Sequence, residues 1–80
     1  MKPRDLLKAL RKLSDIQLEL VWRGRLPWST RRPTTLALQR KGIFNGYWEL
    51  TAYGRRLSRT LRKLADDAGH TDPATARAVL

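Results

Sequence analysis

The side chains best suited to chemistry in this sequence are cationic, and they gather in the middle of the chain. Between positions 23 and 63 there are eleven basic residues and a single acidic one, Glu49, which gives this segment a net charge of +10. The six basic and six acidic residues outside it cancel. Like charges crowded into a small domain repel one another, so the pattern favours a polyanionic partner, with nucleic acid first and an anionic membrane surface second. A merely solvated basic surface is the simpler alternative.

Two of these cations fall at the start of a predicted helix over 31–41, for which Ser29 or Thr30 is the expected cap. Arg31 and Arg32 then occupy its first turn, where free backbone N–H groups favour phosphate. Arginine can also hydrogen-bond a guanine edge in two places at once. We therefore predict base or phosphate contacts for Arg31 and Arg32, and either capping or phosphate contact for Ser29 and Thr30.

The remaining candidate contacts differ in chemistry. Leu36 is either a core residue or a contact for a thymine methyl group. Four other basic residues are candidate phosphate anchors, which fix register without reading sequence: Arg23, Arg25, Arg40 and Lys41. In the last predicted helix, a stripe of basic residues has i, i+4, i+7 and i+8 spacing: Arg55, Arg59, Arg62 and Lys63, with Arg56 beside them. This stripe either contacts the nucleic-acid backbone or is a solvated face of the helix.

Catalytic and metal chemistry find little support in the sequence. Cysteine is absent and His70 is the only histidine, so the usual ligands for zinc and for redox chemistry are missing. Asp66 and Asp67 diverge by about 100° on a helix and do not form an acid/base pair. No catalytic residue, cofactor, metal or small-molecule ligand is expected. The longest apolar run is the three residues of 20–22, which predicts no membrane span and a cytoplasmic location.

Eighty residues with 41% hydrophobic and 30% charged side chains predict one folded domain, mainly α-helical with a small β-hairpin. Leucines at positions 6, 10 and 13 mark an amphipathic helix over 4–13. Ser14 and Gln17 have capping-box spacing, so a second helix begins at Asp15 and ends at Gly24. Because Ile16, Leu18 and Leu20 alternate with polar residues, a strand is the alternative for this segment.

Asn45-Gly46, between two short apolar segments, predicts a hairpin with a two-residue type I′ turn. This register sets Ile43 opposite Trp48 and Phe44 opposite Tyr47. One face then holds Ile43, Trp48 and Leu50, and the other holds Phe44, Tyr47 and Glu49. Phe44 and Tyr47 are the aromatic pair expected to be exposed, while the three tryptophans, Trp22, Trp28 and Trp48, are expected in the core or an interface rather than as stacking platforms.

After the hairpin, Thr51 is a plausible cap for a fourth amphipathic helix, which Gly69 ends. Asp72-Pro73 then starts a short helical stretch, Ala74 to Leu80, with little to bury. The predicted organisation is a domain over residues 1–68 and a C-terminal tail over residues 69–80 that is mobile or forms a short helix. No internal repeat is present.

The order of three helices, a tight hairpin and a further helix resembles the winged helix-turn-helix family of DNA-binding domains, over roughly Asp5 to Leu64. The resemblance rests on Ser29-Thr30, on the segment 38–43, and on the segment 47–54 with its Leu-Thr-x-x-Gly junction. It implies that the third helix enters the major groove of double-stranded DNA and that the hairpin, or wing, touches the backbone or minor groove. By this resemblance Thr30 to Gln39 and Asn45 to Tyr47 inherit those roles.

The function that follows is a small DNA-binding transcriptional regulator, or a replication or recombination accessory factor, acting as a monomer or a homodimer. Three alternatives stay open. Trp22 followed by residues 24–27 resembles a segment of phage-type excisionases. The wing aromatics and the tail would suit a protein-interaction module, such as a small inhibitor of a host protein. The first helix could make an amphipathic membrane binder, although Asp5 and its short apolar stripe argue against it.

Overall fold

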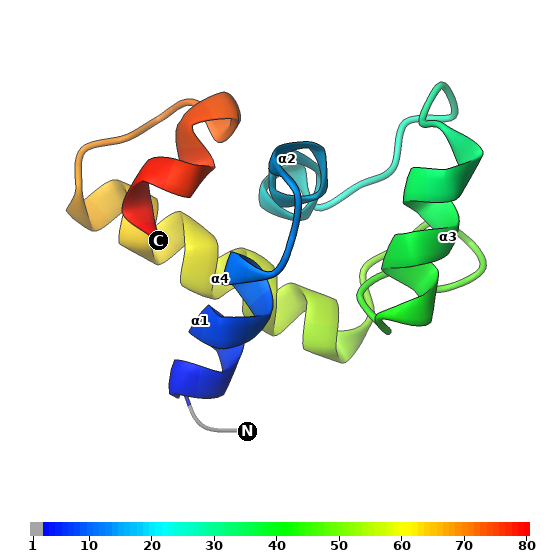
Figure 1. Cartoon of the computed structure of the whole chain (residues 1–80), viewed down its shortest axis with the longest axis horizontal. Helices are drawn as coiled ribbons and strands as arrows, with labels where there is room; N and C mark the ends of the chain where they lie inside the picture. The colour runs from blue at the N-terminus through cyan, green and yellow to red at the C-terminus, as the bar shows by residue number, and fades with distance from the viewer. Residues whose placement is uncertain (1–2) are drawn as a thin grey trace.

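The structure is a computed structural model that describes residues 3–80. The first two residues of the predicted domain lie outside the described part. The chain forms four α-helices and a terminal 3₁₀ helix, η1, within extents of 31 × 26 × 17 Å (Figure 1). The helices are α1 (Pro3–Arg11), α2 (Asp15–Arg23), α3 (Arg32–Arg40), α4 (Ala52–Asp67) and η1 (Pro73–Val79). The prediction of a mainly α-helical domain is confirmed.

The corner between α1 and α2 is set by a local hydrogen-bond exchange. The Ser14 hydroxyl accepts from the Gln17 N–H at 3.2 Å, and the Gln17 side chain accepts from the Ser14 N–H at 3.0 Å. This is the predicted capping box, and it satisfies two N–H groups that a helix start leaves without partners. The helical interpretation of residues 15–23 is confirmed over the strand alternative, and Gly24 ends α2 in the left-handed conformation.

The start of α3 differs from the prediction. Its N-cap is Arg31, which makes no capping hydrogen bond through its side chain, so neither Ser29 nor Thr30 is the cap. Proline explains the shift, because the later start moves Pro33 into the second helical position, where its missing N–H costs nothing. Thr30 instead closes a turn, its N–H donating to Pro27 O at 2.9 Å.

The end of α3 is a Schellman motif. Gly42 adopts a φ of 74°, its N–H donates to Gln39 O at 3.0 Å, and the Ile43 N–H reaches back to Leu38 O at 3.1 Å. The motif normally includes an apolar contact between the residues at these two ends. Leu38 and Ile43 are both buried in the core, so the end of the helix and the core are fixed together.

The segment that follows α3 does not adopt the predicted two-residue turn. Phe44 pairs with Leu50, and Arg25 with Glu49, each as an isolated antiparallel bridge. Positive φ occurs at Trp48 (62°) rather than at Asn45 or Gly46. The predicted pairings of Ile43 with Trp48 and Phe44 with Tyr47, and the faces derived from them, are therefore wrong.

The Asn45 side chain gives the physical reason for the changed register. Its Oδ1 accepts from the N–H of Tyr47 at 2.8 Å and from the N–H of Glu49 at 3.1 Å. An Asx contact of this kind competes with a type I′ turn. The resulting connection is three residues long, and its last residue, Trp48, is left-handed. Such a connection is a known alternative to the two-residue turn.

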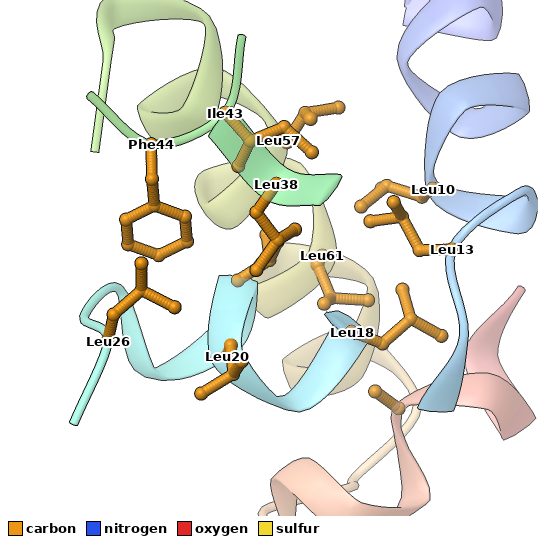
Figure 2. Packing of buried hydrophobic residues seen from close by; sticks show 12 residues of the cluster. Leu10, Leu13, Leu18, Leu20, Leu26, Leu38, Ile43, Phe44, Leu57 and Leu61 are labelled. Carbon is orange, nitrogen blue, oxygen red and sulfur yellow. The ribbon is translucent and has the colours of Figure 1, made fainter. Parts of the chain in front are cut away.

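The longer connection changes which aromatic side chains are buried. Phe44 lies in the core against Leu26 (Figure 2), so its predicted exposure is wrong, whereas the predicted exposure of Tyr47 is confirmed at 86%. Trp28 and Trp48 are 86% and 46% exposed, which contradicts a place in the core for either. Trp22 packs partly buried against the core, as predicted.

The core is formed mainly by leucines from α1, α2 and α4, with Leu38 and Ile43 reaching in from α3 and its end (Figure 2). The most closely packed helix pairs are formed among α1, α2, α4 and η1, whereas α3 lies at one end of the molecule (Figure 1). All residues of α3 are described, and Leu38 alone among them is buried. The side with Arg32, Leu36 and Arg40 stays exposed, while Thr34, Ala37 and the other remaining residues of the inner side are half-buried around Leu38 or lie at the first turn.

The start of α4 is held close against the backbone that leaves α3. The Thr51 hydroxyl accepts from the Gly54 N–H at 3.0 Å and lies within hydrogen-bond distance of Gly42 O, and the Thr51 N–H donates to Ile43 O at 2.9 Å. A β-carbon on Gly54 would lie 2.1 Å from Ile43 O. Only glycine permits this approach, which accounts for the Leu-Thr-x-x-Gly segment in physical terms.

The C-terminal residues dock on the domain, contrary to the expectation that they bury little. Ala76 is fully enclosed in the core cluster, and Val79 and Leu80 pack against it. Arg77 Nε contacts Asp15 Oδ1 at 3.0 Å and its Nη1 donates to Arg11 O at 3.0 Å. One side chain near the end of the chain thus binds the corner between α1 and α2. The predicted short helix is present as η1.

Candidate nucleic-acid interface

The outward face of α3 brings three of the candidate contacts together on one exposed surface. Arg32, Leu36 and Arg40 are all exposed, and their four-residue spacing aligns them along one side of the helix. Leu36 is 38% exposed, so the alternative of a core residue is excluded. Arg31 is also exposed, just before the first turn. The face presents two guanidinium groups with an apolar side chain between them.

A hollow of about 330 Å³ runs along the flank of this face. Its walls come from α3, from the turn before it and from the loop after it: Thr30, Arg32, Thr35, Leu36, Gln39 and Trp48. Four of these, Thr30, Arg32, Leu36 and Gln39, were predicted as contacts. Ser29 is exposed in the preceding turn and does not line the hollow.

The helix and the loop are coupled through one side chain. Gln39 Nε2 donates to Asn45 O at 3.2 Å, and the Asn45 side chain in turn holds the N–H groups of Tyr47 and Glu49. Gln39 and Asn45 were both predicted to bind nucleic acid, and the structure gives both an internal positioning role. Tyr47 projects from this loop into solvent.

Further cations lie where α3 meets α4. The bonds of Thr51 to the backbone at Gly42 and Ile43 bring the end of α3 against the start of α4 (Figure 1). Exposed basic residues therefore flank one junction from both sides: Arg40 and Lys41 on α3, and Arg55 and Arg56 on α4. Arg59 and Lys63 continue along the exposed side of α4.

Two members of the central basic set are engaged within the protein. Arg23 forms an ion pair with Glu19 at 2.8 Å, and Arg62 Nε donates to Trp22 O at 2.8 Å, at the carboxyl end of α2. Arg62 therefore leaves the predicted stripe and helps to terminate another helix. Arg25 is exposed, with its backbone bridged to Glu49.

Of the residues that line the hollow, Trp48 lies outside the predicted contacts, and Thr35 was predicted only as part of the range Thr30 to Gln39. Thr35 lies three residues after Arg32 and four before Gln39, so helical spacing alone would place it on the same flank. Trp48 gave no such signal, because its position depends on the loop register. Its φ of 62° is rare for a large side chain and costs roughly 1–3 kcal/mol.

The arrangement can bind an anion-bearing, partly apolar partner. Within residues 3–80, no three metal-ligating side chains gather in one place, and no helix has the length and hydrophobicity needed to cross a membrane. The chain matches no known family model, and neither the curated proteins nor the solved structures gave a match.

Proposed function

We propose that this protein binds double-stranded DNA in the manner of a winged helix-turn-helix domain, with the outward face of α3 in the major groove. The observation that carries the proposal is the alignment of Arg32, Leu36 and Arg40 on a helix that the core holds by one side chain. An α-helix fits the width of this groove. A helix packed on all sides could not enter it.

The spacing along this face suits base contacts. Arg32 and Arg40 are eight residues apart, about 12 Å along the helix axis, which corresponds to three or four base pairs. Each guanidinium can bond O6 and N7 of a guanine, and Leu36 between them can contact a thymine methyl group. The face therefore offers direct recognition of a short sequence.

Phosphate contacts would come from the cations around this helix. Arg25, Lys41, Arg55 and Arg59 are exposed, and no acidic side chain is paired with them among the contacts of the described residues. The bridges of Arg25 with Glu49 and of Phe44 with Leu50 bring three segments beside α3, which supports a minimal wing. The biological role in this proposal is transcriptional regulation, or an accessory role in replication or recombination.

The proposal is tested by the salt dependence of binding to a fluorescein-labelled duplex, followed by anisotropy. Four to six phosphate contacts give a slope of log affinity against log salt of about −4 to −5, at −0.9 for each contact. A nearly flat salt response, or no binding at low salt, would overturn DNA binding as the function.

A charge-matched pair of variants tests which face binds. The double variant Arg32→Ala and Arg40→Ala should lose both affinity and discrimination between sequences. The control, Arg4→Ala with Lys12→Ala, removes the same charge from exposed positions at the start of α1 and just after its end, and should retain discrimination. Equal effects of the two double variants would show that net charge alone, and not α3, determines binding.

A further inference from the structure

The loop after α3 places a large aromatic side chain where a small residue would be expected. Trp48 has a positive φ, and the third position of such a loop normally holds glycine or asparagine. Gly46, two residues earlier, does not use its conformational freedom in this way. Because the indole is 46% exposed, core packing does not account for a tryptophan at this strained position.

The exposed indole lines the hollow on the flank of α3 together with Leu36 and Arg32. These three groups provide two apolar surfaces and a cation at one opening. Polar atoms complete the walls: the Thr35 hydroxyl donates to Arg31 O at 3.3 Å and keeps its lone pairs, and Gln39 uses its amide nitrogen, not its oxygen, in the bond to Asn45. The hollow thus offers hydrogen-bond acceptors between apolar walls.

We propose that this hollow receives an unstacked nucleobase, so that the protein prefers DNA with unpaired bases over perfect duplex. The inference rests on the proposed function and specifies the form of DNA that the same site prefers. A base has a flat π face for Trp48 and N–H groups on its edge for the acceptors. In this bound form Arg32 contacts the phosphate of the nucleotide instead of the guanine edge that it contacts in perfect duplex.

Charge complementarity favours a nucleotide over an apolar peptide as the occupant. No acidic side chain lines the hollow, and its one charged wall residue is Arg32. A volume of about 330 Å³ lies at the small end of the range for ligand sites, which suits a single nucleotide unit. A peptide helix would need a longer apolar groove.

The test compares three labelled probes of one sequence: a duplex, the same duplex with a central run of mismatches, and a single strand. We expect the mismatched duplex to bind about tenfold more tightly than the perfect one, the effect of stacking about one base. Trp48→Gly removes the indole and suits the positive φ, so it should fold, bind the perfect duplex as before and lose the preference. Trp28→Ala is the matched control, because Trp28 is more exposed yet does not line the hollow.

A spectroscopic measurement keeps the proposal testable even if Trp48→Gly fails to fold. In Trp28→Phe, tryptophan emission should be quenched by the mismatched probe more than by the perfect duplex. The base pocket would be overturned if the perfect and mismatched duplexes bound with equal, salt-dependent affinity. It would also be overturned if the mismatched probe caused no quenching, or if the preference survived Trp48→Gly. Each of these results would leave duplex binding intact. The hollow would then be assigned to another occupant, such as an apolar peptide. Failure of all three probes to bind would remove the proposed function itself.

Discussion

Gly54→Ala is the sharpest test of how α4 joins the rest of the protein. In the helix itself this change should be favourable, because alanine exceeds glycine in helix propensity by about 1 kcal/mol. The structure predicts the opposite outcome, since the new β-carbon would lie 2.1 Å from Ile43 O and 2.9 Å from Leu50 Cδ2. The backbone oxygen belongs to a fixed segment and cannot rotate away as a side chain could.

The size of the effect follows from what must move. The β-carbon and Ile43 O must separate by roughly 1.3 Å or more before they reach an ordinary contact. Overpacking of this kind costs about 1–3 kcal/mol, and weakening the two hydrogen bonds of Thr51 to this segment adds about 0.5–1.5 kcal/mol each. After the gain in propensity, we expect a net loss of about 1–5 kcal/mol. This is a large share of the stability expected for 80 residues.

Thermal unfolding followed by circular dichroism measures this loss. For a domain of this size, 1–5 kcal/mol corresponds to a fall in Tm of about 4 °C or more. Gly46→Ala is the control, because a β-carbon there meets open space and should change stability by less than about 0.5 kcal/mol. A Gly54→Ala protein that melts at or above the temperature of the original would refute the close approach of α4 to Ile43.

Five further substitutions probe single contacts. Ser14→Ala should lower the free energy of unfolding by about 1 kcal/mol in urea, because it removes the cap of α2, and an unchanged midpoint would contradict the capping role. Arg77→Ala should lower the free energy of unfolding by about 1–3 kcal/mol, because it removes bonds to backbone oxygens. Asp15→Asn removes an exposed ion pair and should lower it by less than about 1 kcal/mol. Equal losses in the two variants would show that the ion pair dominates. Arg62→Ala should lower the melting temperature with little change in DNA affinity, because Arg62 binds the backbone of α2. Arg59→Ala should lower DNA affinity with little change in melting temperature. If thermal melts and anisotropy titrations give the same response for both variants, the two arginines have the same role and this distinction is wrong.

The parts of the fold that were predictable from sequence depend on residues close together in the chain. The Ser14 capping box involves positions three apart, and the glycines that end α2 and α3 act within one turn. The helix over 52–67 followed from its apolar spacing and from the Thr51 cap. Each of these features is decided by local chemistry, which a single sequence contains.

The failures involve competition between local signals or contacts between distant residues. Asn45-Gly46 is a strong turn signal, but the Asn45 side chain binds two N–H groups of its own loop and lengthens the turn, which moves Phe44 into the core. The start of α3 depended on two candidate caps and a proline acting together. The docking of Arg77 on residues more than 60 positions earlier has no signature in the sequence around it.

For the candidate interface, sequence supplied the residue types but not their partners. It named Arg32 and Arg40 as contacts but left Leu36 open between the core and the interface, and it could not show that Arg62 binds the carbonyl oxygen of Trp22 or that Gln39 supports the loop. Arginine serves equally well in solvent, in a helix cap or on a phosphate. Only the neighbours that folding provides distinguish these uses.

The contacts of Arg77 with Asp15 and Arg11 also affect the order in which the chain can fold during synthesis. Translation adds about 5–20 residues per second, so the α1–α2 corner emerges from the ribosome seconds before the side chain that completes it. During that interval Ala76 is missing from the core, and the apolar surface that it covers is open to chaperones or to aggregation. Stalling the ribosome at successive lengths should therefore reveal protease resistance only once the segment around Arg77 has left the exit tunnel.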